Sequence, residues 1–136
     1  MAEPQILLVE DDEADVILFQ RSCRKQGLSA DIVVARDGVE ALDYLRRPDR
    51  PVGRMVIVTD LNMPRLNGHE LIEALREDPA NATHVVFVLS TSNLPQDLEA
   101  AYRGNVAGYI VKDARGDRFA ASIAMLRQYF DAITLN

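Results

Sequence analysis

The sequence predicts a doubly wound α/β fold: a single domain with a five-stranded parallel sheet between two layers of helices. Three observations support this prediction. A length of 136 residues suits one domain with one core. Five short apolar runs alternate with five segments of helical periodicity. The runs are continuously apolar, as in strands buried on both faces, and parallel strands need crossover connections that helices supply.

The first strand and helix are predicted within residues 6–27. The run Ile6–Val9 is too short for a helix and too continuous for a half-exposed strand, so we predict a buried strand. A helix over Glu13–Gln26 follows, because apolar residues recur at helical spacing and Gly27 is a usual helix terminator. Its apolar residues are Val16, Phe19 and Cys23.

Two further strand–helix pairs repeat this pattern. Ile32–Ala35 is predicted to be the second strand, and Asp37–Gly38 opens the second helix. Met55–Thr59 is predicted to be the third strand, and a turn bracketed by Pro64 and Gly68 leads into the third helix. The apolar residues that define the two helices are Val39, Leu42, Leu45, Leu71, Ile72 and Leu75.

The last two pairs complete the alternation. Val85–Leu89 is predicted to be the fourth strand, and the polar stretch Ser90–Asn93 precedes a helix from about residue 94 to Arg103. Gly108–Val111 is predicted to be a short fifth strand, followed by a helix from about residue 116 to 133. The apolar stripe of that helix is Phe119, Ile123, Leu126 and Phe130.

Charge and composition disfavour several classes of function. A net charge of -6 and a pI near 4.8 argue against general attraction to nucleic acid or anionic lipid. No apolar run approaches the roughly 20 residues that a membrane span needs. The single cysteine, Cys23, excludes an intrachain disulfide and is predicted to be an inert core residue. We therefore expect a cytoplasmic protein that binds neither nucleic acid nor membrane.

Polar residues stand at the ends of four predicted strands. Glu10 and Asp11 follow the first strand, Asp60 the third, Ser90 the fourth and Lys112 the fifth. In a doubly wound sheet these ends meet at one edge, where ligands bind. Acids at a helix start are ordinarily solvated, but an acid that ends the apolar third strand has no packing purpose. The combination predicts a functional site.

The chemistry of this edge favours a divalent cation and an anionic group. Several carboxylates in one crevice repel one another, and Mg²⁺ suits an oxygen-only site and retains waters that a phosphate can displace. Lys112 could pair with a phosphoryl group and Ser90 could donate a hydrogen bond to it. A carboxylate in line could attack phosphorus.

These motifs resemble the receiver domain of two-component response regulators, over nearly the whole chain. Ile6–Asp12 is similar to the first strand and acidic pair of that family, and Asp60–Gly68 to its phosphoacceptor loop. Leu89–Ser92 and Gly108–Lys112 are similar to its switch and lysine segments. The resemblance implies a flavodoxin-like, receiver-type sheet, with residues 1–136 forming one receiver domain without an output domain.

The resemblance also implies a phosphoacceptor and a metal site. Asp60 would be the nucleophile that becomes an aspartyl phosphate. Asp11 would bind Mg²⁺ directly, Glu10 would assist through water, and the backbone carbonyl of Asn62 would complete the protein ligands. Asp12, a third acid beside the usual pair, is predicted to be a helix cap or a solvated neighbour.

Three further residues would act in catalysis and switching. Ser90 lies 30 residues after Asp60, and Lys112 lies 22 residues after Ser90, which matches the spacing in the family. Ser90 would turn toward the phosphoryl group, Lys112 would pair with it, and Tyr109 would swing inward into the space that Ser90 leaves. Such a protein is a phosphoacceptor in signalling and not an enzyme acting on a separate substrate.

Other features narrow the resemblance. The loop at Arg46–Arg54 is longer than in minimal receivers, the acidic pair begins with Glu10, and the final helix is long. These features resemble the stand-alone regulators that partner bacterial phytochrome histidine kinases. Asp113 departs from the family, which commonly has a cis proline after the lysine.

The resemblance implies three kinds of partner. A sensor histidine kinase, a bacteriophytochrome in the narrower resemblance, would dock on the first helix and the loop after the fifth strand. A downstream target that the sequence does not identify, or a second copy in a homodimer, would dock on the fourth and fifth strand–helix units. Apolar candidates there are Tyr102, Phe119, Tyr129 and Phe130, of which helical spacing places at least two in the core.

Three alternatives stay open. A receiver that has lost phosphorylation would be a constitutive interaction module. An aspartyl-phosphate phosphatase would carry a second aspartate two residues after the nucleophile, where this chain has Asn62. A flavodoxin-like nucleotide carrier would need a phosphate cradle after its first strand, where Glu10–Glu13 repels phosphate. His69 and His84 lie outside the motifs and are predicted to be surface or helix-end residues.

Overall fold

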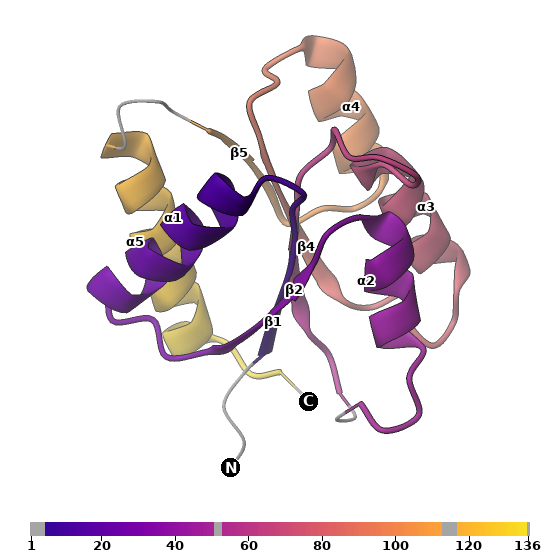
Figure 1. The fold of residues 1–136 in the computed structure, drawn as a ribbon, viewed down its shortest axis with the longest axis horizontal. Helices are drawn as coiled ribbons and strands as arrows, with labels where there is room; N and C mark the ends of the chain where they lie inside the picture. The colour runs from indigo at the N-terminus through magenta and orange to yellow at the C-terminus, as the bar shows by residue number, and fades with distance from the viewer. Residues whose placement is uncertain (1–4, 51–52, 113–116, 136) are drawn as a thin grey trace.

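Five strands and five helices alternate along the chain in the predicted order (Figure 1). The computed structural model describes residues 5–50, 53–112 and 117–135. Each predicted element is present, with ends within one or two residues of those expected. The elements are β1 (Gln5–Val9), α1 (Glu13–Lys25), β2 (Asp31–Ala35), α2 (Gly38–Leu45), β3 (Val56–Thr59), α3 (Gly68–Glu77), β4 (Val85–Ser90), α4 (Pro95–Arg103), β5 (Gly108–Val111) and α5 (Asp117–Ala132).

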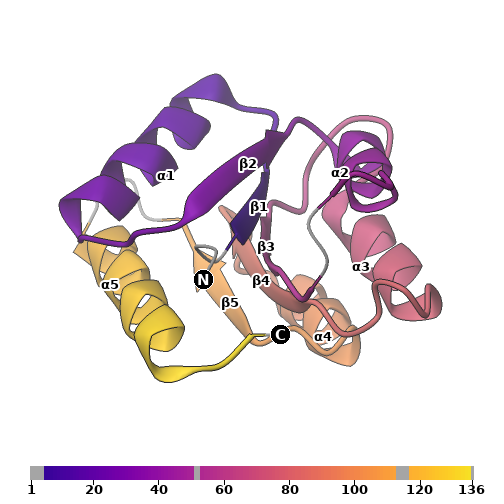
Figure 2. The same ribbon diagram turned by 90° about the horizontal axis from the view of Figure 1, so that it is seen from below.

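The strands form one parallel sheet in the order β2-β1-β3-β4-β5. In the register, Leu7 of β1 lies beside Val33 of β2 on one side and Ile57 of β3 on the other. Helices α1 and α5 cover one face of the sheet, and α2, α3 and α4 cover the other (Figures 1 and 2). The doubly wound fold is therefore confirmed.

The alternation of side chains along β1 explains why its sequence is apolar throughout. Leu7 and Val9 belong to the core beneath α2, α3 and α4, whereas Ile6 and Leu8 belong to the core beneath α1 and α5. All four are buried, because the strand is covered on both faces. Within the described ranges, no helix is both long enough and apolar enough to cross a bilayer.

Local signals fix where the helices begin and end. The Asp12 side chain caps α1 by accepting a hydrogen bond from the backbone of Asp15, which confirms its predicted role as a cap. Helix α1 ends two residues before Gly27, whose φ of 74° lies in the left-handed region that glycine adopts without strain. A capping box between Asn67 and Glu70 starts α3.

Most of the aromatic residues proposed for a docking face contribute to the core. Phe119 is buried, and Tyr129 and Phe130 are partly buried and pack against the core beneath α1 and α5. Tyr102 of α4 is half exposed. Cys23 is buried, and burial raises the pKa of its thiol to about 12, so it is a core residue as predicted.

The prediction that His84 is a surface or helix-end residue is wrong. His84 is 3% exposed, and its imidazole joins the residue before β3 to the turn after α3. The backbone N–H of Met55 donates to Nδ1 of His84 at 3.0 Å, and Nε2 lies 2.8 Å from Oδ1 of Asn81. Because Nδ1 must accept, the ring is neutral with its proton on Nε2. Burial, followed by the charges of neighbouring arginines, lowers its pKa to about 4.

We predict that His84 makes the protein less stable in mild acid. The pKa of His84 is lower in the folded chain than in the unfolded chain, so between pH 6.5 and 4 the unfolded state binds the proton more readily. The free energy of unfolding should fall by about 3 kcal/mol over this interval from this residue alone. Urea denaturation at several pH values would measure the change.

His84→Gln serves as the comparison for this prediction, because an amide keeps polar atoms at the site but does not titrate. The difference between the two stability–pH curves isolates the imidazole from the carboxylates, which titrate in both proteins. The variant should lose less stability on acidification than the wild type. Parallel curves from pH 7 to pH 4 would contradict the assignment of a neutral buried imidazole.

Candidate functional site

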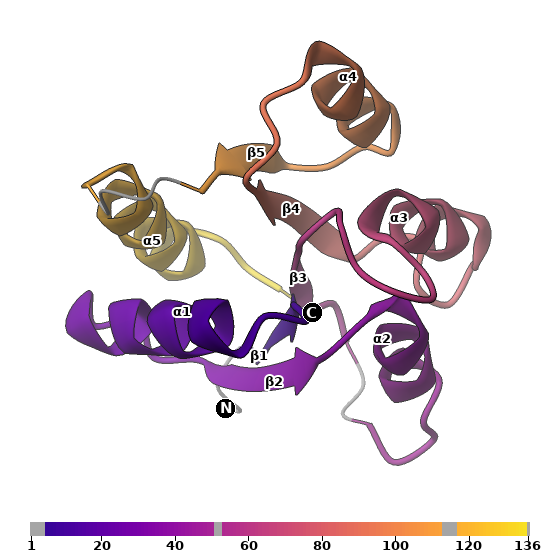
Figure 3. The same cartoon turned by 45° about the horizontal axis from the view of Figure 1, so that its top comes forward.

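The polar residues predicted to meet do so at the carboxyl edge of the sheet, which faces the viewer more directly in Figure 3. Glu10 and Asp11 follow β1, and Asp60 follows β3, its neighbour in the sheet. One carboxylate oxygen from each of these three residues lies within 4.8 Å of the other two. Oxygen donors at this separation suit a hard divalent cation.

Asp60 is fixed by the strand that precedes it and by the loop that follows. Its backbone N–H donates to the carbonyl of Val9 at 3.0 Å, and its Oδ1 accepts the N–H of Leu61 at 2.6 Å. Gly68 comes so close that a Cβ there would lie 2.2 Å from the carbonyl oxygen of Asp60, so any larger residue would displace this loop. The arrangement leaves Oδ2 of Asp60 directed toward Lys112.

The ammonium group of Lys112 sits among three carboxylates. It contacts Glu10, lies 2.8 Å from Oδ2 of Asp15 and lies 3.0 Å from Oδ2 of Asp60. The backbone N–H of Lys112 donates to the carbonyl of Ser90 at 2.7 Å, which prolongs the pairing of β4 with β5. Burial lowers the pKa of Lys112, but the hydrogen bonds to Asp15 and Glu10 and the charge of Asp60 outweigh it and raise the pKa.

Negative charge exceeds positive charge at this edge. Among the described residues, Glu10, Asp15 and Asp60 contact the Lys112 ammonium group, and Asp11 adds a fourth carboxylate beside Glu10 and Asp60. Burial, the largest influence, raises the pKa of Glu10 to about 7, and the charge of Asp60 adds to the effect while Lys112 opposes it. Burial and the charge of Asp60 together disfavour ionisation of Glu10, and a divalent cation would offset the excess of negative charge at this edge.

Ser90 and Tyr109 are linked through Ser92. Ser90 is buried, and its hydroxyl oxygen accepts the backbone N–H of Ser92 at 3.2 Å. The hydroxyl of Tyr109 donates to the carbonyl of Ser92 at 2.9 Å. Burial raises the pKa of the Tyr109 phenol. The Ser92 hydroxyl donates to Asp97 of α4, which also lies 3.1 Å from Nε2 of His69. The loop between β4 and α4 is therefore tied to α3, α4 and β5.

The response regulator receiver domain model matches residues 6–124. The chain belongs to the response regulator receiver family. A receiver domain is a signalling module and not a conventional enzyme, as the sequence predicted. Receivers bind divalent metal ions, and in two-component signalling they are paired with histidine kinases.

Several known regulators are similar to this receiver. It is 34% identical over 128 residues to FilR2, a probable methanogenesis regulatory protein of Methanothrix harundinacea, covering 92% of this chain and 82% of FilR2. The phosphorylated cyanobacterial phytochrome response regulator RcpA has a TM-score of 0.85 and 32% identity, covering 98% of this chain and 99% of RcpA.

The Mn²⁺-bound form of the response regulator Rcp1, a protein of Synechocystis, has a TM-score of 0.86 and 27% identity and covers 98% of this receiver and 99% of Rcp1. Two bacteriophytochrome response regulators are also similar in structure. The narrower resemblance, to phytochrome-associated regulators, is therefore confirmed at the level of family relationship.

The structure brings most of the predicted site residues together. Glu10, Asp11, Asp60 and Lys112 share one cluster, and Ser90 adjoins it through the backbone of Lys112. The backbone N–H of Asn62 lies 3.5 Å from Oδ1 of Asp60, and the role of its carbonyl stays a prediction. Asp113 lies outside the described residues.

Sequence reasoning missed Asp15. An acid in the first turn of a helix is ordinarily explained by the helix dipole, so its contact with Lys112 had no separate signal.

Proposed function

We propose that this receiver accepts a phosphoryl group from a sensor histidine kinase onto Asp60 with Mg²⁺, and that the modification switches its partner-binding surface. The observation that carries the proposal is the contact of Asp60 Oδ2 with Lys112 at 3.0 Å, inside a group of carboxylates that fits a divalent cation. A nucleophile, a cation site and an ammonium group therefore meet at one residue, Asp60.

Glu10, Asp11 and Asp60, with the backbone carbonyl of Asn62, would hold Mg²⁺. The donor set consists of oxygen atoms, and its negative charge is in excess, which suits this ion. When bound, Mg²⁺ would neutralise charge on the transferring phosphoryl group.

Four residues of the chain would carry out phosphoryl transfer and the switch that follows it. A carboxylate oxygen of Asp60 would attack phosphorus as the bond from phosphorus to the kinase histidine breaks. Lys112 would pair with a phosphoryl oxygen. Ser90 would donate its hydroxyl proton to another oxygen, after releasing the N–H of Ser92 that it now accepts. Tyr109 would then give up the Ser92 carbonyl and move toward the vacated space.

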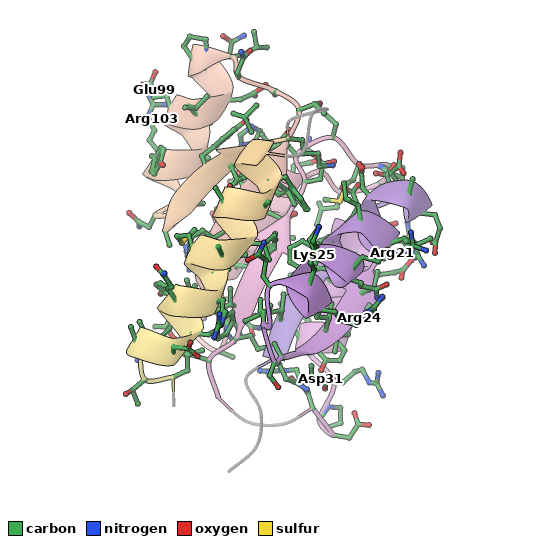
Figure 4. All side chains as sticks on the ribbon, turned by 90° about the vertical axis from the view of Figure 1, so that its left-hand side faces the viewer. Arg21, Arg24, Lys25, Asp31, Glu99 and Arg103 are labelled. Atoms are coloured by element: carbon green, nitrogen blue, oxygen red, sulfur yellow. The ribbon has the colours of Figure 1, made fainter. Side chains whose placement is uncertain are left out.

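Helix α1 offers a surface for the kinase. Ile17 and Leu18 are 40% and 48% exposed. The second half of α1 carries three basic residues, although the protein has a net charge of -6. These cations have no ion-pair partner among the described residues, and Figure 4 shows them on the outer side of the helix. The similarity to RcpA supports a bacteriophytochrome as the kinase. The cations are Arg21, Arg24 and Lys25.

The downstream partner would contact α4 and β5. Tyr102 of α4 is half exposed. Glu99 and Arg103 of the same helix form an ion pair (Figure 4). A homodimer through this face, and residence in the cytoplasm, stay predictions. Sedimentation with and without beryllofluoride would test the dimer, because a mass equal to one chain at every concentration would exclude it.

Intact mass spectrometry tests the proposed function directly. Incubation with Mg²⁺ and acetyl phosphate should add one phosphoryl mass, and a chelator should prevent the addition. Beryllofluoride binding with Mg²⁺ is the second measurement, because rapid hydrolysis would hide a covalent product. Failure in both would favour an interaction module that works without phosphorylation.

We predict that Asp11→Ala removes Mg²⁺ binding and with it phosphoryl uptake. The side chain of Asp11 is exposed and makes no hydrogen bond or ion pair to another described residue, whereas it supplies one of three carboxylates at the cation site. Calorimetric titration with Mg²⁺ should show an affinity weaker by about tenfold or more, because one charged ligand is lost. Phosphoryl uptake at the wild-type rate by this variant would contradict the metal assignment.

A further inference from the structure

Asp15 holds Lys112 but has no part in the proposed metal site. Its Oδ2 lies 2.8 Å from the ammonium nitrogen, closer than the 3.0 Å to Asp60. The carboxylates within reach of one cation are those of Glu10, Asp11 and Asp60, and Asp15 is not one of them. Asp15 is therefore free to keep its contact when the other carboxylates engage a cation.

The carboxylate of Asp15 projects from a rigid part of the fold. Its backbone N–H donates to the capping side chain of Asp12 at 3.2 Å, and the next residue, Val16, is buried in the core. The first turn of α1 is thus anchored at both its cap and its apolar face. The Asp15 side chain is 36% exposed, so it reaches Lys112 from the solvent side of the cluster.

The ammonium group has three N–H donors, and among the described residues it has three carboxylate partners: Glu10, Asp15 and Asp60. Under the proposed function, Glu10 and Asp60 become engaged with the cation and the phosphoryl group. The donors that they release can meet phosphoryl oxygens only if the ammonium stays beside Asp60. A lysine side chain on four flexible carbons does not stay there unless another group holds it.

We propose that Asp15 is a positioning residue that holds the Lys112 ammonium beside Asp60 for capture of the phosphoryl group. The inference rests on the proposed function of Asp60 and Lys112. It assigns to α1 a part in phosphoryl binding that is separate from its surface for the kinase.

Beryllofluoride affinity at saturating Mg²⁺, measured by calorimetry on the full chain, tests this role. Asp15→Asn keeps the shape of the side chain but removes its charge. We expect its dissociation constant for beryllofluoride to be about tenfold higher than that of the wild type, as for loss of a charge-assisted contact. Its affinity for Mg²⁺ should stay within about twofold, because Asp15 lies outside the cation site.

The direction of the change in beryllofluoride affinity distinguishes positioning of Lys112 from simple repulsion between Asp15 and the bound anion. Removing a negative charge near an anion site tightens anion binding if Asp15 acts only through its field. Tighter or unchanged beryllofluoride binding by Asp15→Asn would therefore overturn the proposal. Glu13→Gln is the matched control, because it removes an acid of the same helical turn that pairs with Arg36 instead of Lys112. It should bind as the wild type does.

A double-mutant cycle completes the test. In a Lys112→Ala background, Asp15→Asn should change beryllofluoride affinity by less than about twofold, because the group that it positions is absent. A full tenfold effect in that background would overturn the proposal. With Lys112 present, Asp15→Glu keeps the charge, and wild-type affinity for beryllofluoride in this variant would support the proposal. If the wild type itself fails to bind beryllofluoride, the proposed function falls as well. If the wild type and Asp15→Asn bind beryllofluoride with equal affinity, the positioning role of Asp15 is rejected but the proposed function is not.

Discussion

Asp60→Asn abolishes covalent phosphoryl uptake and leaves the fold intact. An amide is not a nucleophile toward phosphorus, and Asp60 is the carboxylate that contacts both the Lys112 ammonium and the proposed cation site. Intact mass after incubation with Mg²⁺ and acetyl phosphate should show no added phosphoryl group. The free energy of unfolding should change by no more than about 1 kcal/mol, because the amide can still accept the N–H of Leu61.

Asp12→Asn is the matched control for this prediction. It removes a neighbouring carboxylate, but asparagine caps a helix as well as aspartate does, and Asp12 lies outside the cation site. The control should gain one phosphoryl mass. A phosphoryl group on Asp60→Asn would mean that another residue accepts it, and peptide mapping would locate that residue.

The fold could be predicted because each strand carries its own signal. The run Ile6–Val9 is apolar on both faces of β1, since helices cover both sides of the sheet. Gly27 ends α1 in a left-handed conformation, and the sequence marks that position by the residue itself. The strand order follows less directly, because residues of β1 say nothing about which strand lies beside them.

The sequence predicted those site residues that directly follow a strand. Glu10, Asp11, Asp60 and Lys112 come directly after strands, and the carboxyl ends of parallel strands meet at one edge. Asp15 does not follow a strand, and its contact with Lys112 depends on how α1 packs above the sheet. That packing is a tertiary property without a local pattern.

His84 was missed for a related reason. A histidine in a turn between a helix and a strand is usually solvated, and its neighbours in sequence do not reveal burial. Its partners, Met55 and Asn81, come from the start of β3 and from the turn after α3. Only the paired strands β3 and β4 bring these segments together.

Lys112→Ala should weaken phosphoryl uptake and abolish the switch. The variant loses the one ammonium group in the cluster, so charge on the phosphoryl group is no longer balanced there. Adding Mg²⁺ and beryllofluoride to the wild type should shift the backbone amide resonances of Ser92 and Tyr109. These shifts should be absent in the variant, although slow phosphorylation of Asp60 persists. Lys25→Ala removes an exposed lysine of α1 that lies outside the cluster, and with Mg²⁺ and beryllofluoride it should show the same amide shifts as the wild type.

The same substitution should change how stability depends on pH. The Glu10 side chain is 4% exposed, and burial already raises its pKa to about 7 while Lys112 opposes that effect. Without Lys112 the pKa of Glu10 rises further, so the folded state binds the proton more tightly than the unfolded state. Lys112→Ala should therefore lose about 1–3 kcal/mol at pH 8 and recover part of it by pH 6. An equal loss at both values would show that Glu10 stays ionised without its lysine.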